Sequence, residues 1–412
     1  MAGITRSVYK IAAILIISLS IITSCSKENR GKSYSYFVSK ELAVSYSSSY
    51  VSNLITSVAT IYPEINGLKS YVSGDVNVYS LVYKTEISGE EINASGVVAI
   101  PLTPGQYPVV CFQNGTNTVN DYAPSRSPAI INYQMAEVVA SMGFIVVIPD
   151  YPGFGESSQI PHPYLITEPT VKADIDMLFA VKELCGSELQ GFAVKNEYYL
   201  IGYSQGGWAT LALHKAMELD YSNDFNLEGS VCGAGPYDIT LLLQNMINTS
   251  SYPMPVYLGY IVNAYSEYDQ FSNPVTDILN EPYASRLSSL YTGTLDFDQI
   301  NSQLTTSIPE LINADFISGF TAAPKYESVR EALLKNSITP WHTLKPLYFL
   351  HGENDTQVSP LVTEHIYDGM ISEGTSAEIC KKEIITGADH SDGVVPCMIK
   401  GLLFIIDLSI SK

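Results

Sequence analysis

Two hydrophobic patterns alternate along most of the chain. Short apolar runs, which are typical of buried strands, occur at residues 76–87, 92–100, 109–112, 144–148, 197–201, 227–233, 345–350 and 377–385. Apolar residues recur at one-turn spacing, as in helices, at residues 133–142, 171–185, 204–219, 361–370 and 395–408. A Ser- and Tyr-rich stretch at 40–62 is also predicted to be helical. The alternation predicts an α/β fold, with a mostly parallel sheet flanked by helices.

Residues 237–342 interrupt this alternation. The segment lies between two predicted strands and is rich in Tyr and Leu. It is too long and too apolar to be a simple loop. We interpret it as a largely helical cap inserted into one α/β core, which comprises residues 37–236 and 343–412. The alternative is a decorative insertion without a functional role.

The first 24 residues have the pattern of a targeting segment. Arg6 and Lys10 precede an apolar stretch at 11–23, which is shorter than the ~20 residues that span a bilayer. The stretch resembles a bacterial lipoprotein signal peptide that ends before Cys25, although Ile22 stands where Leu is commoner. The resemblance implies cleavage before Cys25, lipidation of its thiol and a polar tether at 25–36. The protein is then expected in the cell envelope, anchored to a bacterial membrane; a plain secretory signal is the alternative.

Composition excludes several classes of protein. Of the 412 residues, 46% are apolar, which excludes a disordered chain. The one long apolar run lies at the N-terminus, which excludes a polytopic membrane protein. Acidic residues outnumber basic ones by 42 to 22, and the net charge is −20, or −22 once the two basic residues of the leader are removed. Nucleic acid is therefore not an expected partner, because negative charge repels a polyanion.

The chain has six cysteines, and export implies an oxidising compartment. If Cys25 carries lipid, five remain and at least one thiol is unpaired. Cys380 and Cys397 are the first candidates for a disulfide because they are closest along the chain. Cys111 and Cys232 lie in apolar runs and are predicted to be buried. Neither C-x-x-C nor H-E-x-x-H occurs, so the sequence does not support a zinc site.

The sequence Gly202-Tyr203-Ser204-Gln205-Gly206 matches the motif G-x-S-x-G. The motif alone is weak, but it follows a predicted strand and opens a predicted helix, which is the context of a nucleophile elbow. The turn in such an elbow is sharp and strained, and glycines at 202 and 206 remove side chains that would clash with neighbouring elements. We therefore predict that Ser204 is a nucleophile, with the N-terminus of its helix favouring negative charge nearby.

A serine nucleophile needs a base and an acid, and in folds built around such an elbow they follow in the order acid, then His. His390 lies in a turn-rich loop after the strand at 377–385 and is predicted to be the base. Asp355 follows the strand at 345–350 and is predicted to be the acid, with Glu353 as the alternative.

The other candidates have less suitable positions. His365 also follows the predicted acid, but it lies within a predicted helix and is expected to have a surface or packing role. Asp389 adjoins His390 in the sequence, so it is expected to point elsewhere and to be solvated. His351 is interpreted as a structural residue at a strand end. Four histidines precede the predicted acid and do not fit the chain order: His162, His214, His342 and His351.

Two backbone N–H groups are expected to bind the negative oxygen that forms during acyl transfer. One belongs to Gln205, the residue after the nucleophile. The other is expected from the loop that follows the strand at 109–112, and we predict Thr116, with Gly115 as the second choice. A simple Asn-Gly turn at 114–115 is the alternative interpretation of this loop.

These motifs resemble the α/β-hydrolase fold and, within it, the secretory lipase family. The resemblance is carried by Asp121-Tyr122-Ala123-Pro124-Ser125, Pro149-Asp150-Tyr151-Pro152-Gly153, Gly202-Tyr203-Ser204-Gln205-Gly206-Gly207 and His351-Gly352-Glu353-Asn354-Asp355. It implies ester hydrolysis, a cap where residues 237–342 fall and an oxyanion residue where Thr116 stands.

Together these features predict a serine carboxylic-ester hydrolase that uses a Ser-His-Asp triad and an acyl-enzyme intermediate. The Tyr-rich insertion favours an apolar or aromatic ester, from a small molecule or a lipid. Tyr also stacks on sugars, so an esterase of acylated glycans is an alternative. A serine peptidase on the same fold is another, and a surface binding lipoprotein on an inactive hydrolase fold is the non-enzyme alternative. No metal or organic cofactor is implied, because the triad supplies the chemistry.

Overall fold

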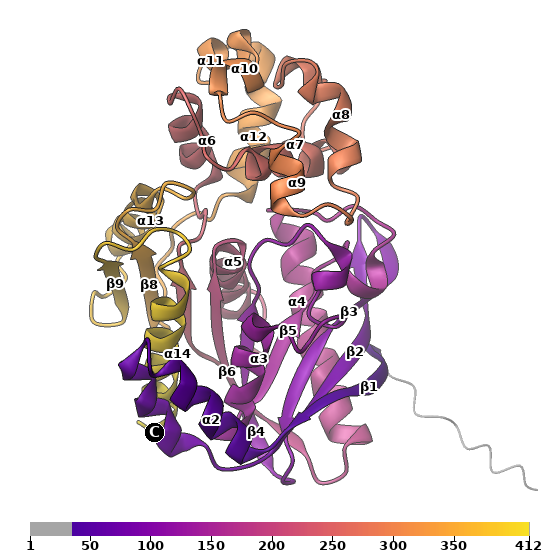
Figure 1. Ribbon diagram of the computed structural model, residues 1–412, viewed down its shortest axis with the longest axis vertical. Helices are drawn as coiled ribbons and strands as arrows, with labels where there is room; N and C mark the ends of the chain where they lie inside the picture. The colour runs from indigo at the N-terminus through magenta and orange to yellow at the C-terminus, as the bar shows by residue number, and fades with distance from the viewer. Residues whose placement is uncertain (1–34, 412) are drawn as a thin grey trace, which may run out of the picture. The chain divides into compact units, whose positions relative to one another are not determined.

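A nine-stranded, mostly parallel sheet forms the centre of the computed structural model, which describes residues 35–411 (Figure 1). The order across the sheet is β1-β2-β3-β5-β4-β6-β7-β8-β9. The first three strands and the β3–β5 pair are antiparallel, and all pairs from β5 to β9 are parallel. The strands are β1 (Phe37–Tyr46), β2 (Val76–Ile87), β3 (Glu90–Pro101), β4 (Gln106–Gln113), β5 (Ile145–Pro149), β6 (Ala193–Tyr203), β7 (Leu227–Gly233), β8 (Leu347–Gly352) and β9 (Cys380–Ile385). The predicted α/β class is confirmed.

Helices cover both faces of the sheet (Figure 1). The helices of the core are α2 (Ser48–Val58), α3 (Ile131–Glu137), α4 (Thr167–Glu183), α5 (Gln205–Leu219), α13 (Pro360–Ser372) and α14 (Val394–Ile410). Alternate residues of β6 show how the faces separate, because side chains of a strand point to opposite sides. Tyr199 and Ile201 belong to the buried cluster that contains Val51 of α2 and Ile405 of α14, whereas α4 and α5 pack on the opposite face.

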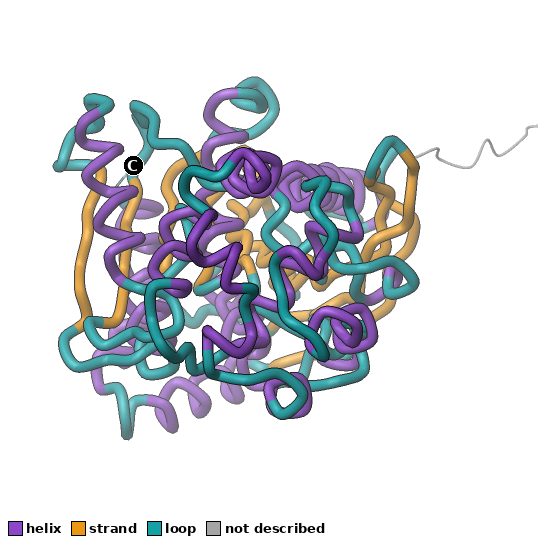
Figure 2. The backbone as a smooth tube through the Cα atoms, turned by 90° about the horizontal axis from the view of Figure 1, so that it is seen from above, coloured by secondary structure: helices purple, strands orange, loops and turns teal. Residues whose placement is uncertain are grey.

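The segment between β7 and β8 is largely helical, as predicted. Within the fully described residues 237–342 the helices are α6 (Ile239–Ile247), α7 (Pro255–Glu267), α8 (Tyr283–Leu290), α9 (Phe297–Asn301), α10 (Ile308–Leu311), α11 (Ala314–Gly319) and α12 (Glu327–Asn336). They lie beyond the carboxyl ends of the parallel strands (Figures 1 and 2). Tyr265 of α7 donates a hydrogen bond to the carbonyl of Leu165, in the connection after β5. The insertion therefore contacts the edge of the sheet where loops follow the strands.

The predicted helix at 40–62 is partly wrong. Residues Phe37–Tyr46 form strand β1, which pairs with β2 at the sheet edge. The helix begins only at Ser48, where the side chain of Ser47 accepts the N–H of Tyr50 and caps the helix. The edge of β2 thus captures a segment whose own sequence pattern is ambiguous, which is a tertiary effect.

The predicted helix at 133–142 also differs in detail. It is split into α3 and a 3-10 turn at Val138–Met142. The turn ends as expected at Gly143, which has a φ of 90°, a conformation that glycine adopts without a steric cost.

The proposed disulfide between Cys380 and Cys397 is wrong. Both thiols are free and buried, one in β9 and the other in α14. Cys111 and Cys232 are buried, as predicted, and Cys185 is likewise a buried free thiol. The described part of the chain therefore contains no disulfide. Cys25 and the leader lie outside the described residues.

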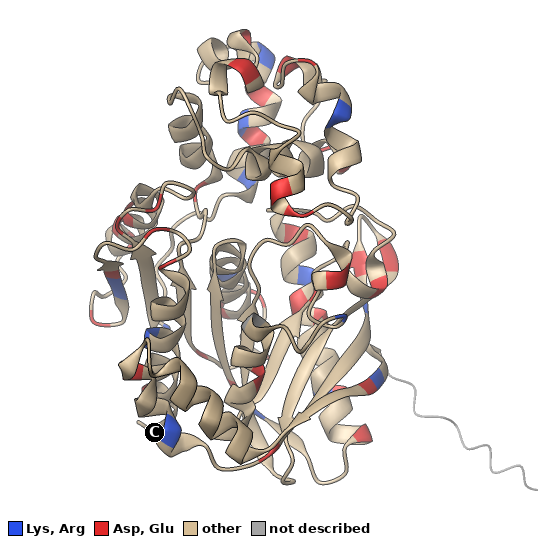
Figure 3. Cartoon of the chain, in the orientation of Figure 1, with Lys and Arg blue, Asp and Glu red and all other residues tan. Residues whose placement is uncertain are grey.

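Charge is distributed over both parts of the structure. Acidic side chains lie on the core and on the helices of the insertion (Figure 3), in keeping with the net charge of −20. Between residues 35 and 411, no helix is both long and apolar enough to cross a membrane.

Glu137 is a carboxyl group buried at the end of α3. Its side chain accepts a hydrogen bond of 3.0 Å from the hydroxyl of Tyr46, which joins α3 to β1. Burial raises the pKa of Glu137 to about 8, so the folded protein holds a proton that the unfolded chain releases near pH 4.3. This group's contribution to stability is therefore present below about pH 4.3 and is lost as the pH rises to about 8.

The substitution Glu137→Gln is expected to remove this pH-dependent loss of stability. The amide is neutral at every pH and still accepts the hydrogen bond from Tyr46. The melting temperature of the variant, relative to the wild type, is expected to rise between pH 5 and pH 8. Glu91→Gln is the control, since Glu91 is an exposed partner of Lys84. A difference in melting temperature between Glu137→Gln and wild type that stays constant from pH 5 to pH 8 would contradict the prediction.

Candidate active site

Ser204 occupies the sharp turn between β6 and α5. Its backbone has a φ of 60° and a ψ of −124°, a conformation that residues other than glycine rarely adopt. The N–H of Ser204 donates to the carbonyl of Gly233 on the neighbouring strand β7. A strained residue of this kind persists only where the surrounding structure enforces it, and such positions cluster at functional sites.

The glycines of the motif are required by close backbone contacts. A Cβ atom on Gly202 would lie 2.3 Å from the carbonyl oxygen of Gly206. A Cβ atom on Gly206 would lie 2.0 Å from the carbonyl oxygen of Gln113, at the end of β4. The contacts are with backbone atoms, which cannot move aside as the end of a flexible side chain can.

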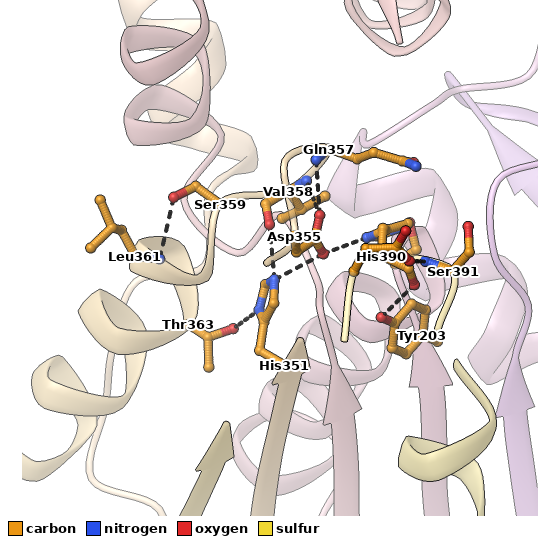
Figure 4. Close-up of polar contacts among 12 residues, drawn as sticks. Tyr203, His351, Asp355, Gln357, Val358, Ser359, Leu361, Thr363, His390 and Ser391 are labelled. Atoms are coloured by element: carbon orange, nitrogen blue, oxygen red, sulfur yellow. Dashed lines mark hydrogen bonds and ion pairs between the residues drawn. The ribbon is translucent and has the colours of Figure 1, made fainter. Parts of the chain in front are cut away.

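Three predicted site residues meet at the carboxyl edge of the sheet. The hydroxyl of Ser204 lies 2.9 Å from Nε2 of His390. Nδ1 of His390 lies 2.6 Å from Oδ2 of Asp355, a contact drawn in Figure 4. An ionised carboxylate only accepts hydrogen bonds, so Nδ1 carries the hydrogen and Nε2 accepts from the Ser204 hydroxyl. Tyr203 donates to the carbonyl of His390 at 2.8 Å and fixes the loop that carries the imidazole.

Asp355 is buried and held by several donors. Its Oδ1 accepts the N–H groups of Gln357 and Val358, both at 2.9 Å. Burial by itself raises the pKa of Asp355, but hydrogen bonds from His351 and His390 outweigh burial and keep the pKa well below its usual range. The carboxyl group is therefore ionised, as the partner of an imidazole N–H should be.

The contact of His351 with Asp355 was not predicted. His351 is the penultimate residue of β8, and its Nε2–H lies 3.1 Å from Oδ2 of Asp355 and 2.9 Å from the carbonyl of Val358. Its Nδ1 accepts from the hydroxyl of Thr363 at 2.7 Å (Figure 4). The structural interpretation of His351 understated its role, because the ring also binds the predicted acid. The spacing of four residues in His351-Gly352-Glu353-Asn354-Asp355 was the signal available in the sequence.

The structure does not bring the alternative residues into this cluster. Glu353 is exposed and accepts the N–H of Gly387. His365 is 61% exposed and pairs with Asp238. Asp389 accepts the N–H groups of Ser391 and Asp392 and lies at the surface.

The loop that follows β4 lies beside the elbow. Asn114 is buried and donates to the carbonyl of Pro149 at 2.7 Å. A Cβ atom on Gly115 would lie 3.6 Å from the carbonyl oxygen of Tyr203. Thr116 is half-buried, and its hydroxyl lies 3.0 Å from that of Tyr164. The loop is thus in reach of the turn at Ser204, and the oxyanion roles of Gln205 and Thr116 remain predictions.

The secretory lipase family model matches residues 127–385, which is more than half of the chain. This chain belongs to the secretory lipase family. The match includes Ser204 and Asp355 and ends five residues before His390. Membership makes the protein a hydrolase of the lipase and esterase type.

Solved structures share the α/β-hydrolase fold with this member of the family. A hydrolase of Legionella pneumophila is 23% identical, with a TM-score of 0.80 over 92% of this chain and 99% of its own. The rice cell wall degrading esterase LipA of Xanthomonas oryzae is 21% identical, with a TM-score of 0.75 over 88% and 94%. Lipase A of Candida antarctica, in its closed state, is 16% identical, with a TM-score of 0.65 over 90% and 81%. A search of curated proteins finds no match.

Tyrosines of α7 and the segment before it reach the loops of the lipase-family site. Tyr252 donates to the carbonyl of Gln357 at 2.9 Å, and Tyr257 donates to its side-chain oxygen at 3.3 Å. Burial and the nearby charge of Asp355 together raise the pKa of Tyr257 to about 12. The insertion therefore places neutral phenols beside the loop that carries the predicted acid.

A stack of three tyrosines forms a second contact between the insertion and the core, near the loop after β4. Tyr164 stacks on Tyr260 at a centroid distance of 4.4 Å, and Tyr260 stacks on Tyr291 at 4.6 Å. The Tyr291 hydroxyl donates to the carbonyl of Val256. The stack connects the insertion to Tyr164, whose hydroxyl lies 3.0 Å from that of Thr116.

Gly206→Ala is expected to lower the free energy of unfolding by about 2 kcal/mol or more, since the new Cβ overlaps the backbone of β4. Urea denaturation would measure this difference. Gly186→Ala is the matched control, because a Cβ atom there meets nothing within 4 Å. Equal stabilities of the two variants would show that the turn tolerates a side chain and would contradict the geometry.

Proposed function

We propose that the protein is a serine carboxylic-ester hydrolase in which Ser204, His390 and Asp355 act as nucleophile, base and acid. The observation that carries the proposal is the continuous chain of hydrogen bonds from Ser204 through His390 to Asp355. Its direction suits proton transfer, because the imidazole accepts from the serine hydroxyl on one side and donates to a carboxylate on the other. Membership of the secretory lipase family supports an ester as the substrate.

The reaction proceeds through two tetrahedral intermediates. Oγ of Ser204 attacks the ester carbonyl while its proton passes to Nε2 of His390, and Asp355 stabilises the imidazolium. When the bond to the alcohol breaks, the alcohol oxygen takes the proton from His390 and an acyl group remains on Ser204. Water then loses a proton to His390 and attacks the acyl carbonyl, and the proton returns to Ser204 as the acid leaves.

The negative oxygen of each intermediate needs donors. The backbone N–H of Gln205 lies at the start of α5, where the helix N-terminus also favours negative charge. The backbone N–H of Thr116 is the second proposed donor, since its loop lies against the elbow. No metal or organic cofactor has a place in this reaction.

We further propose that residues 237–342 act as a cap over the site and favour an apolar or aromatic ester. The support is the set of tyrosines of the insertion: Tyr252 and Tyr257 donate to Gln357, and Tyr260 stacks on Tyr164. Export fits a family of secretory lipases, and lipidation of Cys25 would anchor the protein to a bacterial membrane, on the periplasmic or the surface side.

Nitrophenyl esters from acetyl to palmitoyl, hydrolysed by the purified full chain, test the proposed activity. Ser204→Ala is expected to lower kcat by about 10⁴-fold or more. Asp355→Asn is expected to lose about as much, because the imidazole then loses its carboxylate partner. Glu353→Gln is the matched control and is expected to keep the wild-type rate, since Glu353 lies outside the hydrogen-bond chain.

The outcome across chain lengths distinguishes the substrates. An optimum with long chains supports a lipase, whereas an optimum with acetyl esters supports an esterase of small or glycan esters. Wild-type turnover in Ser204→Ala, or loss in Glu353→Gln equal to that in Asp355→Asn, would refute the assigned roles. Cleavage of peptides but of no ester would favour the peptidase.

A further inference from the structure

A buried histidine that the proposed reaction does not use touches the residue next to the nucleophile. His162 is 5% exposed. Its Nδ1 lies 2.7 Å from the carbonyl oxygen of Pro152, and its Nε2 lies 2.9 Å from the side-chain nitrogen of Gln205. Gln205 is itself 1% exposed and directly follows Ser204.

The direction of both hydrogen bonds follows from the groups involved. The carbonyl of Pro152 can only accept, so Nδ1 carries a hydrogen. Burial lowers the pKa of His162 to about 4, and the ring is neutral near pH 7. Nε2 therefore accepts, and the amide N–H of Gln205 donates to it. The ring connects the loop after β5 to the first residue of α5.

The loop that holds the ring is tightly constrained. Tyr151, Gly153 and Gly155 have φ values of 69°, 92° and 58°, and a Cβ atom on Gly153 would lie 2.4 Å from Cα of His162. The loop begins at Asp150, whose buried carboxylate accepts the hydroxyls of Ser95 and Ser125 and the N–H of Ser125. Pro152 therefore presents its carbonyl from a fixed position.

The same ring is linked through Tyr164 to the second proposed oxyanion residue. His162 packs against Tyr164 at a centroid distance of 6.0 Å, and the hydroxyl of Tyr164 lies 3.0 Å from that of Thr116. Tyr260 of the insertion meets the ring edge-on at 5.6 Å. One neutral imidazole thus contacts Gln205, Tyr260 of the insertion, and Tyr164, whose hydroxyl meets that of Thr116.

We propose that His162 is a positioning residue that holds Gln205, and with it the backbone N–H after the nucleophile, in the geometry that binds the oxyanion. The proposal rests on the function proposed above. The bond from Gln205 to Nε2 limits rotation of the Gln205 side chain and ties the first residue of α5 to the constrained loop. A donor displaced from the developing negative charge loses much of its effect on the transition state, while the ground state is bound nearly as before.

Two substitutions separate the two bonds of the ring. The substitution His162→Asn places an amide N–H at the position of Nδ1 and keeps the bond to Pro152, but the shorter side chain does not reach Gln205. The substitution His162→Gln places an amide oxygen at the position of Nε2 and keeps an acceptor for Gln205. Positioning therefore predicts that His162→Gln is active and that His162→Asn is impaired, although both remove a buried imidazole.

The readout is the rate at which a fluorophosphonate labels Ser204 in the full chain, together with kcat and KM for a nitrophenyl ester. The phosphonyl adduct is tetrahedral and places its polar phosphoryl oxygen where the oxyanion forms, and labelling needs no knowledge of the natural substrate. We expect His162→Asn to label at least about tenfold more slowly than wild type, with a parallel fall in kcat and a change in KM of less than about threefold. We expect His162→Gln to stay within about threefold of wild type.

His214 is the matched control. It is fully buried, lies on the same helix α5, and bonds through both nitrogens, to Ser230 at 2.8 Å and to Thr343 at 3.0 Å. His214→Asn is expected to lower the melting temperature but to label within about threefold of wild type.

Equal slowing in His162→Asn and His162→Gln, a loss confined to KM, or equal slowing in His214→Asn would overturn the proposal while the triad stands. A wild-type protein that is not labelled at Ser204 would instead refute the proposed function, and this inference with it.

Discussion

The backbone contact between the turn at Ser204 and the end of β4 is the constraint on which the site depends. Gly206 lies so close to the carbonyl of Gln113 that no side chain fits between them. This contact sets the start of α5 directly against the loop that carries Thr116. Ser204, two residues before Gly206, has a strained backbone conformation. Its hydroxyl lies at the carboxyl edge of the sheet, within reach of the loops that follow β8 and β9.

The carboxylate of Asp355, in the loop after β8, is buried and therefore needs hydrogen-bond donors. A carboxylate taken out of water is costly unless donors surround it, and Asp355 has two backbone N–H groups and two imidazole rings as partners. His351 thus belongs to the same hydrogen-bonded unit as His390, although it lies on the side away from Ser204. His162 is its counterpart on the other flank, where a second buried ring contacts Gln205. Two buried histidines outside the proposed triad thus contact its neighbours: His351 binds Asp355, and His162 binds Gln205.

Much of this arrangement could be predicted from local pattern and chain order. Ser204, Asp355 and His390 are separated by up to 186 residues, yet each follows a strand, and parallel strands bring their following loops to one edge. What could not be predicted depends on partners distant in the sequence. Strand β1 forms because β2 offers a free edge, and Cys380 and Cys397 are near in the chain but lie in separate elements. The contacts of His351 and His162 require knowledge of which loops meet in three dimensions.

The most direct test of the account is to trap the covalent intermediate. Wild-type protein is mixed with a nitrophenyl ester, quenched in acid during turnover and digested. The mass of the peptide that contains Ser204 is then measured by mass spectrometry. The account predicts that this peptide gains the mass of the acyl group less one hydrogen, and that the gain disappears when the ester is exhausted. Turnover with the acyl group on another residue, or with no acylated peptide under conditions where deacylation limits the rate, would contradict it.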